Sequence, residues 1–206
     1  MDFLHQTWKK LAANYCSDEK LITEFWSEIE RQYSSPNRYY HNLQHIGFML
    51  RMAEDFKHKI HDFDTLLFSV FYHDIIYNFS RSDNEEQSAA VAKKRLATLQ
   101  VPADKTDKCV QQILATKIHN SCNDPDTNFL VDFDLLILGQ SWETYQEYAR
   151  SIRKEYSDYP QFLYNKGRRK VLQSFLEKER IYNSKEIFTL CEEKARENLK
   201  RELETL

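Results

Sequence analysis

The sequence predicts an all-α protein that folds as a single-domain helical bundle, and three observations support this. The chain has 206 residues but only three glycines and four prolines, too few to supply the turns of an all-β sandwich or barrel. Apolar residues recur at helical spacing along most of the chain. Hydrophobic residues make up 41% and charged residues 30%, which is ordinary globular composition, and the length suits one domain over 1–206.

The first quarter of the chain contains three stretches in which apolar residues return every three or four positions. Such spacing places them on one face of a helix. These positions are Phe3, Leu4, Trp8, Leu11 and Tyr15, then Leu21, Ile22, Phe25, Trp26 and Ile29, then Ile46, Met49, Leu50, Ala53 and Phe56.

The same spacing continues to the end of the chain. Leu66, Leu67, Val70 and Phe71 lead into the run FYHDIIY, which we expect to continue one helix. All four prolines fall between periodic segments, where the missing N–H donor of proline does least harm. Further helices are expected over 89–99, 109–118, 130–138 and 142–156, with two more near 159–180 and 184–205.

Composition and charge exclude several function classes. A formal net charge of −3 argues against a dedicated nucleic-acid surface, which would be clearly basic. Every apolar run is too short to span a membrane, and the N-terminal stretch lacks the cleavage site of a secretory signal. We therefore expect a cytoplasmic protein. The cysteines are scattered and form no CxxC pair, which predicts free thiols: Cys16, Cys109, Cys122 and Cys191.

The C-terminal stretch EEKARENLKRELETL predicts a solvated amphipathic helix. It pairs acidic and basic residues four positions apart, Glu192 with Arg196 and Glu197 with Arg201. The same helix could instead pack against a second subunit, so a homodimer is an alternative that the sequence leaves open.

Two histidines in the stretch RYYHNLQHIGFML could share one site. His41 and His45 are four residues apart, and on a helix their side chains would point within about 40° of the same direction. Hydrogen-bonded histidines of the core or surface are the alternative interpretation of this pair alone.

A histidine and an aspartate are embedded in the apolar run LLFSVFYHDIIYNF. These are His73 and Asp74. An ionised carboxylate in such surroundings is costly unless it is paired or binds a metal. An arginine or backbone amides could also compensate Asp74.

Two further aspartates lie in the apolar stretch NFLVDFDLLILG. Side chains two residues apart diverge on a helix, so we expect one of Asp132 and Asp134 to face a shared interior site and the other to form hydrogen bonds elsewhere. Imidazoles and carboxylates together are the ligands of a mixed N/O divalent-metal site, and one cation would compensate all of these groups.

This ordered set resembles the signature of the HD-domain metal-dependent phosphohydrolases: a histidine, an adjacent His-Asp pair and a distant aspartate, all on helices. His45, His73, Asp74 and Asp134 match that order. In relatives with a D-x-D at this place the second aspartate is usually the ligand. The resemblance therefore implies that Asp134 binds the metal, while Asp132 supports a neighbour.

The resemblance covers about half of the chain and closes with a D-x-D-x-x-x-x-G motif, here DFDLLILG. It implies a helical bundle of the HD-domain type, with a metal-site core at about 38–139 and C-terminal helices over 142–206. It also implies one divalent metal ion, which could be Mn, Mg, Fe, Ni or Zn.

Two more matches concern catalysis. HNLQH is similar to the H-N-x-x-H of cyclic-nucleotide phosphodiesterases, which implies that His41 donates a proton to the leaving oxygen. DNEEQSA is similar to the H-E-x-x-[GS]-A that often follows the HD pair, which implies that Glu85 faces the metal and its water. Asn84 stands where many relatives have a histidine ligand for a second metal. A solvated helix start is the alternative for Glu85.

Other polar residues match the family less specifically. His119 corresponds to a histidine that often precedes the D-x-D and contacts substrate or an outer metal. Arg38, Arg81 and Lys117 lie where a cation could neutralise substrate phosphate, but each could equally be an ordinary surface charge.

The resemblance implies that the chain hydrolyses a phosphate ester, with a nucleotide or related small molecule as substrate, through a metal-activated water. One alternative is a nucleotide- or small-molecule-binding regulatory protein that keeps the metal site but turns over little. Another is oxygen chemistry on a related scaffold, against which Asn84 counts.

The C-terminal helices contain many basic and aromatic residues that could cover the pocket. Solvation of a helical surface is the interpretation that we favour for them. The most suggestive are Tyr148, Arg153, Tyr156, Arg168 and Arg169.

Overall fold

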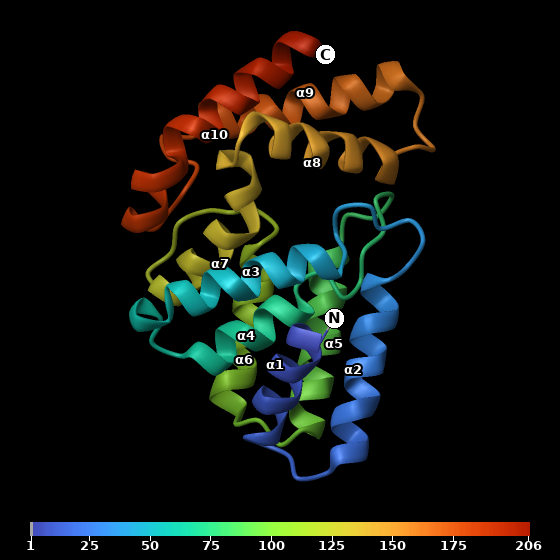
Figure 1. Cartoon of the computed structure of the whole chain (residues 1–206), viewed down its shortest axis with the longest axis vertical. Helices are drawn as coiled ribbons and strands as arrows, with labels where there is room; N and C mark the ends of the chain where they lie inside the picture. Colours follow the sequence, from blue (N-terminus) through green and yellow to red (C-terminus); the bar gives the residue numbers. More distant parts are fainter. Residues whose placement is uncertain (1) are drawn as a thin grey trace.

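The structure of the protein is a computed structural model that describes residues 2–206 (Figure 1). Over this range it contains α-helices and two short 3-10 helices and no strand, so the all-α prediction is confirmed. The helices are α1 (Asp2–Ala13), α2 (Glu19–Tyr33), α3 (Leu43–Asp55), η1 (Lys57–Lys59), α4 (Phe63–Tyr72), α5 (Asn84–Thr98), α6 (Ala103–Ala115), α7 (Pro125–Leu135), η2 (Leu136–Gly139), α8 (Trp142–Glu155), α9 (Gln161–Glu177) and α10 (Lys185–Thr205).

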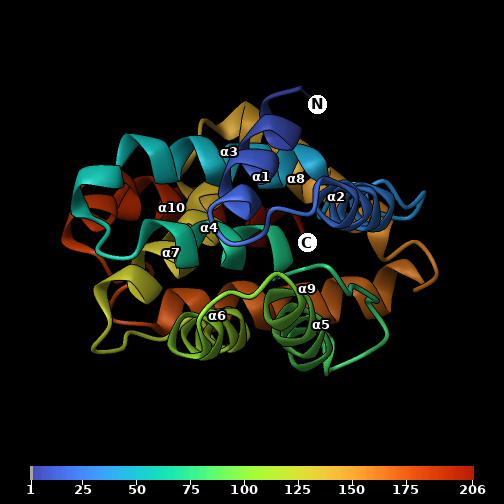
Figure 2. The same cartoon turned by 90° about the horizontal axis from the view of Figure 1, so that it is seen from below.

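The molecule has two layers, both visible in Figure 1. Helices α1 to α7 form the larger part, which we call the body. Helices α8, α9 and α10 lie together at one end of the body and form the C-terminal layer. Figure 2, seen from below, shows α4 between α3 and the pair α5 and α6, so α4 is the central helix of the body.

Burial explains why α4 is central. Residues 65–72 of this helix are all buried, which matches the apolar run in the sequence. Trp8 packs edge-on against Phe68 and Phe71, with ring centroids 6.0 and 5.3 Å apart. The indole N–H of Trp8 donates to the carbonyl oxygen of Ile22 at 2.9 Å. Trp8 of α1 thereby contacts both α2 and α4, and these contacts hold the C-terminal end of α4 in place.

Side-chain caps fix where several helices begin. The Asn42 side chain accepts from the backbone N–H of Gln44 at 2.8 Å, so α3 starts at Leu43. Such caps satisfy donors that have no partner within the helix. As a consequence His41 lies before α3. The prediction that His41 and His45 share one helix face is therefore wrong.

Two of the predicted helices end earlier than the apolar pattern suggested. Helix α4 ends at Tyr72, so His73 is its C-cap and Asp74 lies in the following turn. Helix α7 covers Pro125–Leu135 and continues as η2. In both places the apolar run extends past the helix because the turn itself is buried, for example at Ile75.

The C-terminal layer is held by a buried ion pair rather than merely solvated. Arg168 is 7% exposed and donates to both carboxylate oxygens of Glu202, at 2.8 and 2.9 Å. The Tyr145 hydroxyl donates to the same carboxylate. The interpretation that we favoured, solvation of a helical surface, is therefore wrong for Arg168. Arg169 is exposed, as that interpretation predicts.

Two sequence predictions about the C-terminal helix have different outcomes. The pair of Glu192 and Arg196 forms, with 2.7 Å between Oε1 and Nε. In the second pair, Arg201 instead lies over the ring of Trp142, 4.2 Å from its centroid, and Glu197 contacts Lys194 at 3.3 Å.

The four cysteines are free thiols, as predicted. Between residues 2 and 206 the structure contains no helix that is both long enough and apolar enough to cross a membrane.

Candidate metal centre

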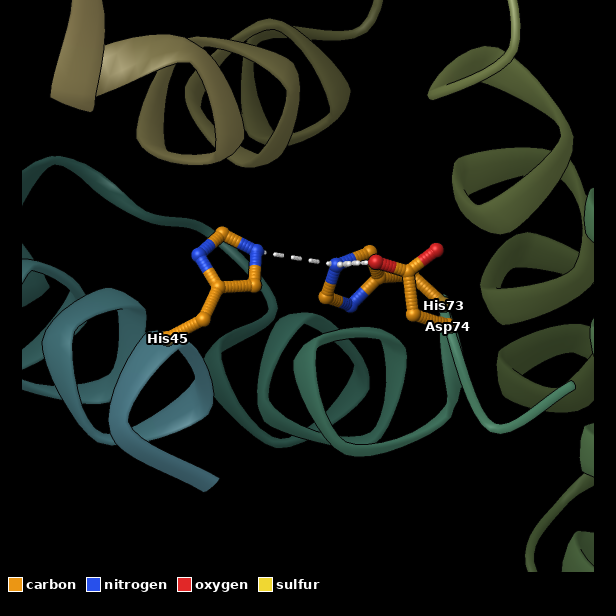
Figure 3. A group of neighbouring side chains, drawn as sticks. All are labelled: His45, His73 and Asp74. Atoms are coloured by element: carbon orange, nitrogen blue, oxygen red, sulfur yellow. Dashed lines mark hydrogen bonds and ion pairs between the residues drawn. The ribbon is translucent and has the colours of Figure 1, made fainter. Parts of the chain in front are cut away.

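Three residues from two neighbouring helices bring ligand atoms together. His45 projects from the first turns of α3, and His73 and Asp74 follow the last turn of α4 (Figure 3). One ligand atom from each lies within 4.8 Å of the other two. The Nε2 atoms of His45 and His73 are 3.3 Å apart, and His73 Nε2 is 3.2 Å from Asp74 Oδ2. This group could hold a metal ion.

The orientation of His73 suits a metal ligand. Its Nδ1 lies 2.9 Å from the carbonyl oxygen of Val70, one turn earlier in α4. A carbonyl oxygen can only accept, so Nδ1 carries the proton. In the neutral imidazole the lone pair is then on Nε2, the atom that faces His45 and Asp74. A hydrogen bond of this kind fixes the tautomer of metal-binding histidines.

Asp134, which lies in α7, joins the group. Its Oδ1 is 3.1 Å from His45 Nε2 and 3.7 Å from His73 Nε2. Its Oδ2 lies 2.8 Å from Nε2 of His119. The structure therefore brings together all four residues of the predicted ligand set, with His119 next to them.

His119 is held in an unusual backbone conformation. Its φ is 55°, in the left-handed region that residues other than glycine rarely adopt. The Lys178 ammonium donates to the carbonyl oxygens of Ile118 and His119, at 3.0 and 2.9 Å. Strained residues of this kind cluster at functional sites. Whether His119 contacts substrate stays a prediction.

The charges of the cluster explain its pKa shifts. Burial acts to raise the pKa of Asp74, but the charge of His73, its hydrogen bond and the charge of His41 together lower it. Burial likewise acts to raise the pKa of Asp134, and hydrogen bonds from His119 and His45 hold it well below its usual range. Two carboxylates are thus ionised in a poorly solvated place. Such an arrangement requires a positive charge beside them.

The two histidines respond in opposite directions. Burial lowers the pKa of His45. Burial also acts to lower the pKa of His73, but the charge of Asp74 and its hydrogen bond raise it to about 9. Without a metal, a proton on His73 supplies the charge that the carboxylates need. Two imidazoles and two carboxylates fit a borderline divalent cation such as Zn, Fe, Mn or Ni.

Asp132 does not face this cluster. Its side chain is fully buried and accepts from the backbone N–H groups of Asn183 and Ser184, both at 2.7 Å, and from the Ser184 hydroxyl at 2.5 Å. Burial raises the pKa of Asp132 to about 6. Asp132 therefore anchors the start of α10, while Asp134, two residues later, faces the histidines.

A second polar group lies beside the cluster and centres on His41. Its Nδ1 is 2.7 Å from Glu155 Oε2, and Glu155 Oε1 accepts from the backbone N–H groups of Tyr40 and His41 at 2.7 and 3.0 Å. The Tyr77 hydroxyl also donates to Glu155 at 2.9 Å. Burial acts to lower the pKa of His41, but the hydrogen bond to Glu155 and the charges of Asp74 and Glu155 together raise it overall.

Glu155 is a residue that sequence reasoning missed. It lies at the end of α8, 114 positions from His41, and its surroundings in the sequence are charged. A buried glutamate within RSIRKEY carries no periodic signal, since its neighbours look like an ordinary exposed helix. Only the packing of α8 against the loop before α3 reveals it.

The three candidate phosphate-binding cations are all engaged elsewhere. Arg38 is buried and donates to the carbonyl oxygens of His41, Asp74 and Ile75 at 3.2, 2.6 and 3.0 Å. It therefore ties the His41 loop to the turn that carries Asp74. Arg81 forms an exposed pair with Asp83, and Lys117 contacts Glu86 at 2.5 Å.

Glu85 and Asn84 lie at the first turn of α5. The Asn84 side chain accepts from the N–H of Asn78 at 3.0 Å and donates to its carbonyl oxygen at 2.9 Å, so it closes the loop before the helix. Glu85 lies 3.9 Å from the Lys117 ammonium and forms no ion pair with the cluster within residues 2–206. A role of Glu85 toward the metal and its water stays a prediction.

Comparisons of the chain with protein-family models, with curated proteins and with solved structures found no match. A function for the chain therefore has to be inferred from the geometry of the site and from the order of its residues along the sequence.

Proposed function

We propose that the protein is a metal-dependent phosphohydrolase of the HD-domain type. One observation carries the proposal: His45, His73, Asp74 and Asp134, from three separate parts of the sequence, lie within a few ångströms of one another in a poorly solvated place. Their order along the chain is that of the family signature. The substrate that we propose is a phosphate ester of a nucleotide or related small molecule.

These four residues would hold one divalent cation. A cation bound there lowers the pKa of a water molecule and polarises a phosphoryl group, which supplies a nucleophile at neutral pH. The side chains of Asp74 and Asp134 are 15% and 16% exposed, so the cluster is accessible to water on its carboxylate side.

His41 is the general acid in this proposal. Its Nδ1 is bound to Glu155, so Nε2 is the atom left to donate. The raised pKa favours the protonated ring, which is the form that a general acid needs. In hydrolysis of a monoester, an oxygen from water joins phosphorus and the bond from phosphorus to the leaving oxygen breaks. The leaving oxygen takes the proton of His41, giving an alcohol and inorganic phosphate.

Metal content and activity test the proposal together. We expect purified protein to contain a divalent metal and to release phosphate or nucleoside from a panel of mono-, di- and cyclic nucleotides with added manganese or magnesium. The substitution Asp74→Asn removes the charge of one ligand without changing its size. It should lower metal content and reduce activity by at least about 100-fold.

Asp107→Asn is the matched control. Asp107 is exposed and pairs only with Lys93, at 3.1 Å, so this variant should keep both metal and activity. Full activity of Asp74→Asn would refute the proposal. Tight nucleotide binding without turnover would favour a regulatory protein, and iron with oxygen consumption would favour an oxygenase.

A further inference from the structure

A cavity of about 430 Å³ opens beside His41, between the body and the C-terminal layer. His41 and Tyr77 line it from the body, and residues of α8, of α9 and of the loop between them line it from the C-terminal layer. Its size lies within the range of cavities that bind small organic molecules. This cavity, which we call the tyrosine pocket, is separate from the charged groups of the metal centre.

His41 connects the tyrosine pocket to the candidate metal centre. Its ring lies 6.2 Å from that of His45, centroid to centroid, and stacks on the ring of Tyr77 at 4.1 Å. A general acid donates to the oxygen of the leaving group. If a phosphate lies at the metal centre, a leaving group that His41 protonates lies beside the tyrosine pocket, which His41 lines.

The walls of the pocket suit a flat ring. Aromatic faces and edges pack well against other rings, at centroid separations of about 4.5–7 Å. Tyr156 and Tyr164 already pack in this way, with centroids 6.1 Å apart. The aliphatic residues Leu163 and Val171 lie at the edge, each 45% exposed. The tyrosines of the lining are Tyr77, Tyr148, Tyr156, Tyr159 and Tyr164.

The charges around the pocket argue against an anionic leaving group. Arg168 is the one lysine or arginine in the described lining, and Glu202 neutralises it through two hydrogen bonds. The neighbouring Arg153 donates to the carbonyl oxygens of Tyr156 and Tyr159, at 2.7 and 3.0 Å. A phosphate on the leaving group would meet no uncompensated cation there.

The surroundings of His119 are different. A second cavity, of about 280 Å³, adjoins His119 and is lined by Lys178, Glu179 and Arg180. Polar and charged groups therefore gather on the His119 side, and aromatic groups gather on the His41 side.

We propose that the tyrosine pocket binds a planar, uncharged ring carried by the leaving group. The substrate is then a phosphate ester of a ring-bearing alcohol, whose ring is a nucleobase or another aryl group. A phosphoanhydride that would leave a charged phosphate in the pocket is disfavoured. This inference rests on the proposed hydrolase function and on His41 as its acid.

Gly167 offers a way to fill the pocket without disturbing the fold. It lines the cavity within α9, and a Cβ atom added there would meet nothing within 4 Å. Gly167→Phe should therefore place a ring in the cavity. Lys170→Phe adds the same side chain to an exposed position of α9 outside the pocket and is the matched control.

The kinetic test, with manganese present, compares three esters, AMP, 4-nitrophenyl phosphate and ribose 5-phosphate, with one phosphoanhydride, ADP. We expect kcat/KM for AMP or for 4-nitrophenyl phosphate to exceed that for ribose 5-phosphate by about tenfold or more. We also expect kcat/KM for AMP to exceed that for ADP. In Gly167→Phe, the ratio of kcat/KM for the ring-bearing ester to kcat/KM for ribose 5-phosphate should be close to one. Lys170→Phe should leave this ratio unchanged. AMP and 4-nitrophenyl phosphate distinguish a nucleobase from a simpler aryl ring.

A binding measurement separates failure of this inference from failure of the hydrolase proposal. Calorimetry with metal-free protein should detect binding of adenosine or 4-nitrophenol, at least about tenfold weaker in Gly167→Phe. If no ester is hydrolysed but this binding is seen, the pocket assignment stands without the hydrolase. Ring-bearing and ringless esters with equal kcat/KM, or ring binding unaffected by Gly167→Phe, would overturn the inference.

Discussion

Among single residues, Glu155 controls the protonation of His41. Its carboxylate is bound to His41 Nδ1 at 2.7 Å and raises the pKa of the imidazole. In the proposed mechanism the protonated form of His41 is the active form, so activity should persist above the ordinary histidine pKa and fall as pH rises past the raised value. Glu155→Gln removes the charge, so the alkaline limb of the kcat profile should move to lower pH. A pH–rate series with a soluble ester measures both limbs.

The control for this experiment is Tyr77→Phe. It removes one donor to Glu155 but keeps the carboxylate and the ring that stacks on His41, so the alkaline limb should move less than in Glu155→Gln. An unchanged profile in Glu155→Gln would mean that Glu155 only supports the loop before α3 through its bonds to the backbone.

The raised pKa of His73 predicts that metal binding depends on pH. Its pKa in the metal-free protein is about 9, so the ring is protonated at pH 7. A metal ligand must be neutral, and binding therefore releases about one proton per ion. The apparent metal affinity should rise about tenfold per pH unit between pH 6 and 8. Titration calorimetry in buffers of different ionisation enthalpy measures the proton release, and a pH-independent affinity would contradict it.

The sequence predicted the cluster residues but not those that support them. His45, His73 and Asp74 could be recognised because polar groups in apolar runs are unusual. Arg38 and Glu155 gave no such signal, since each lies in a polar stretch. Their importance comes from contacts over 36 and 114 positions, which depend on tertiary packing and not on local pattern.

At the scale of helices, Asp132 ties the beginning of α10 to α7. Asp132→Ala would leave two backbone N–H groups and the Ser184 hydroxyl without their buried partner. We expect the free energy of unfolding to fall by about 2–3 kcal/mol, measured by urea denaturation. Metal content should stay the same, because Asp132 points away from His45 and His73. Loss of metal without loss of stability would instead place Asp132 among the ligands.

Element boundaries show why periodicity was an incomplete guide. The run FYHDIIY reads as one helix, yet α4 ends at Tyr72. The backbone N–H of Asp74 lies 3.1 Å from the Tyr33 hydroxyl, and Arg38 holds the carbonyl oxygen of Asp74. Partners from α2 and the following loop thus replace the intrahelical bonds. Because these partners are distant in sequence, the buried turn cannot be told from a buried helix by its residue types.

For the molecule as a whole, the two layers must keep a fixed separation, because the tyrosine pocket lies between them. Helix α10 crosses η2, where the Asn198 side chain donates to the carbonyl oxygens of Leu138 and Gln140 at 2.8 and 2.9 Å. Gly139 lies between these two carbonyls in the sequence. The glycine of the D-x-D-x-x-x-x-G motif thus marks the contact of body and C-terminal layer.

Gly139→Ala should weaken this contact between the layers. A Cβ atom at Gly139 would lie 2.7 Å from Cys191 Cβ and 3.0 Å from its carbonyl oxygen, so α10 would have to move. We expect a loss of about 1–3 kcal/mol in the free energy of unfolding and weaker ring binding in the tyrosine pocket.

Gly167→Ala is the control, because a Cβ atom at Gly167 meets nothing within 4 Å. This variant should stabilise α9 by about 0.5–1 kcal/mol. Adding Cys191→Gly to Gly139→Ala removes the closer contact and should make the combined loss smaller than the sum of the separate losses. Strict additivity, or a Gly139→Ala variant as stable as the wild type, would show that the layers do not depend on this close approach.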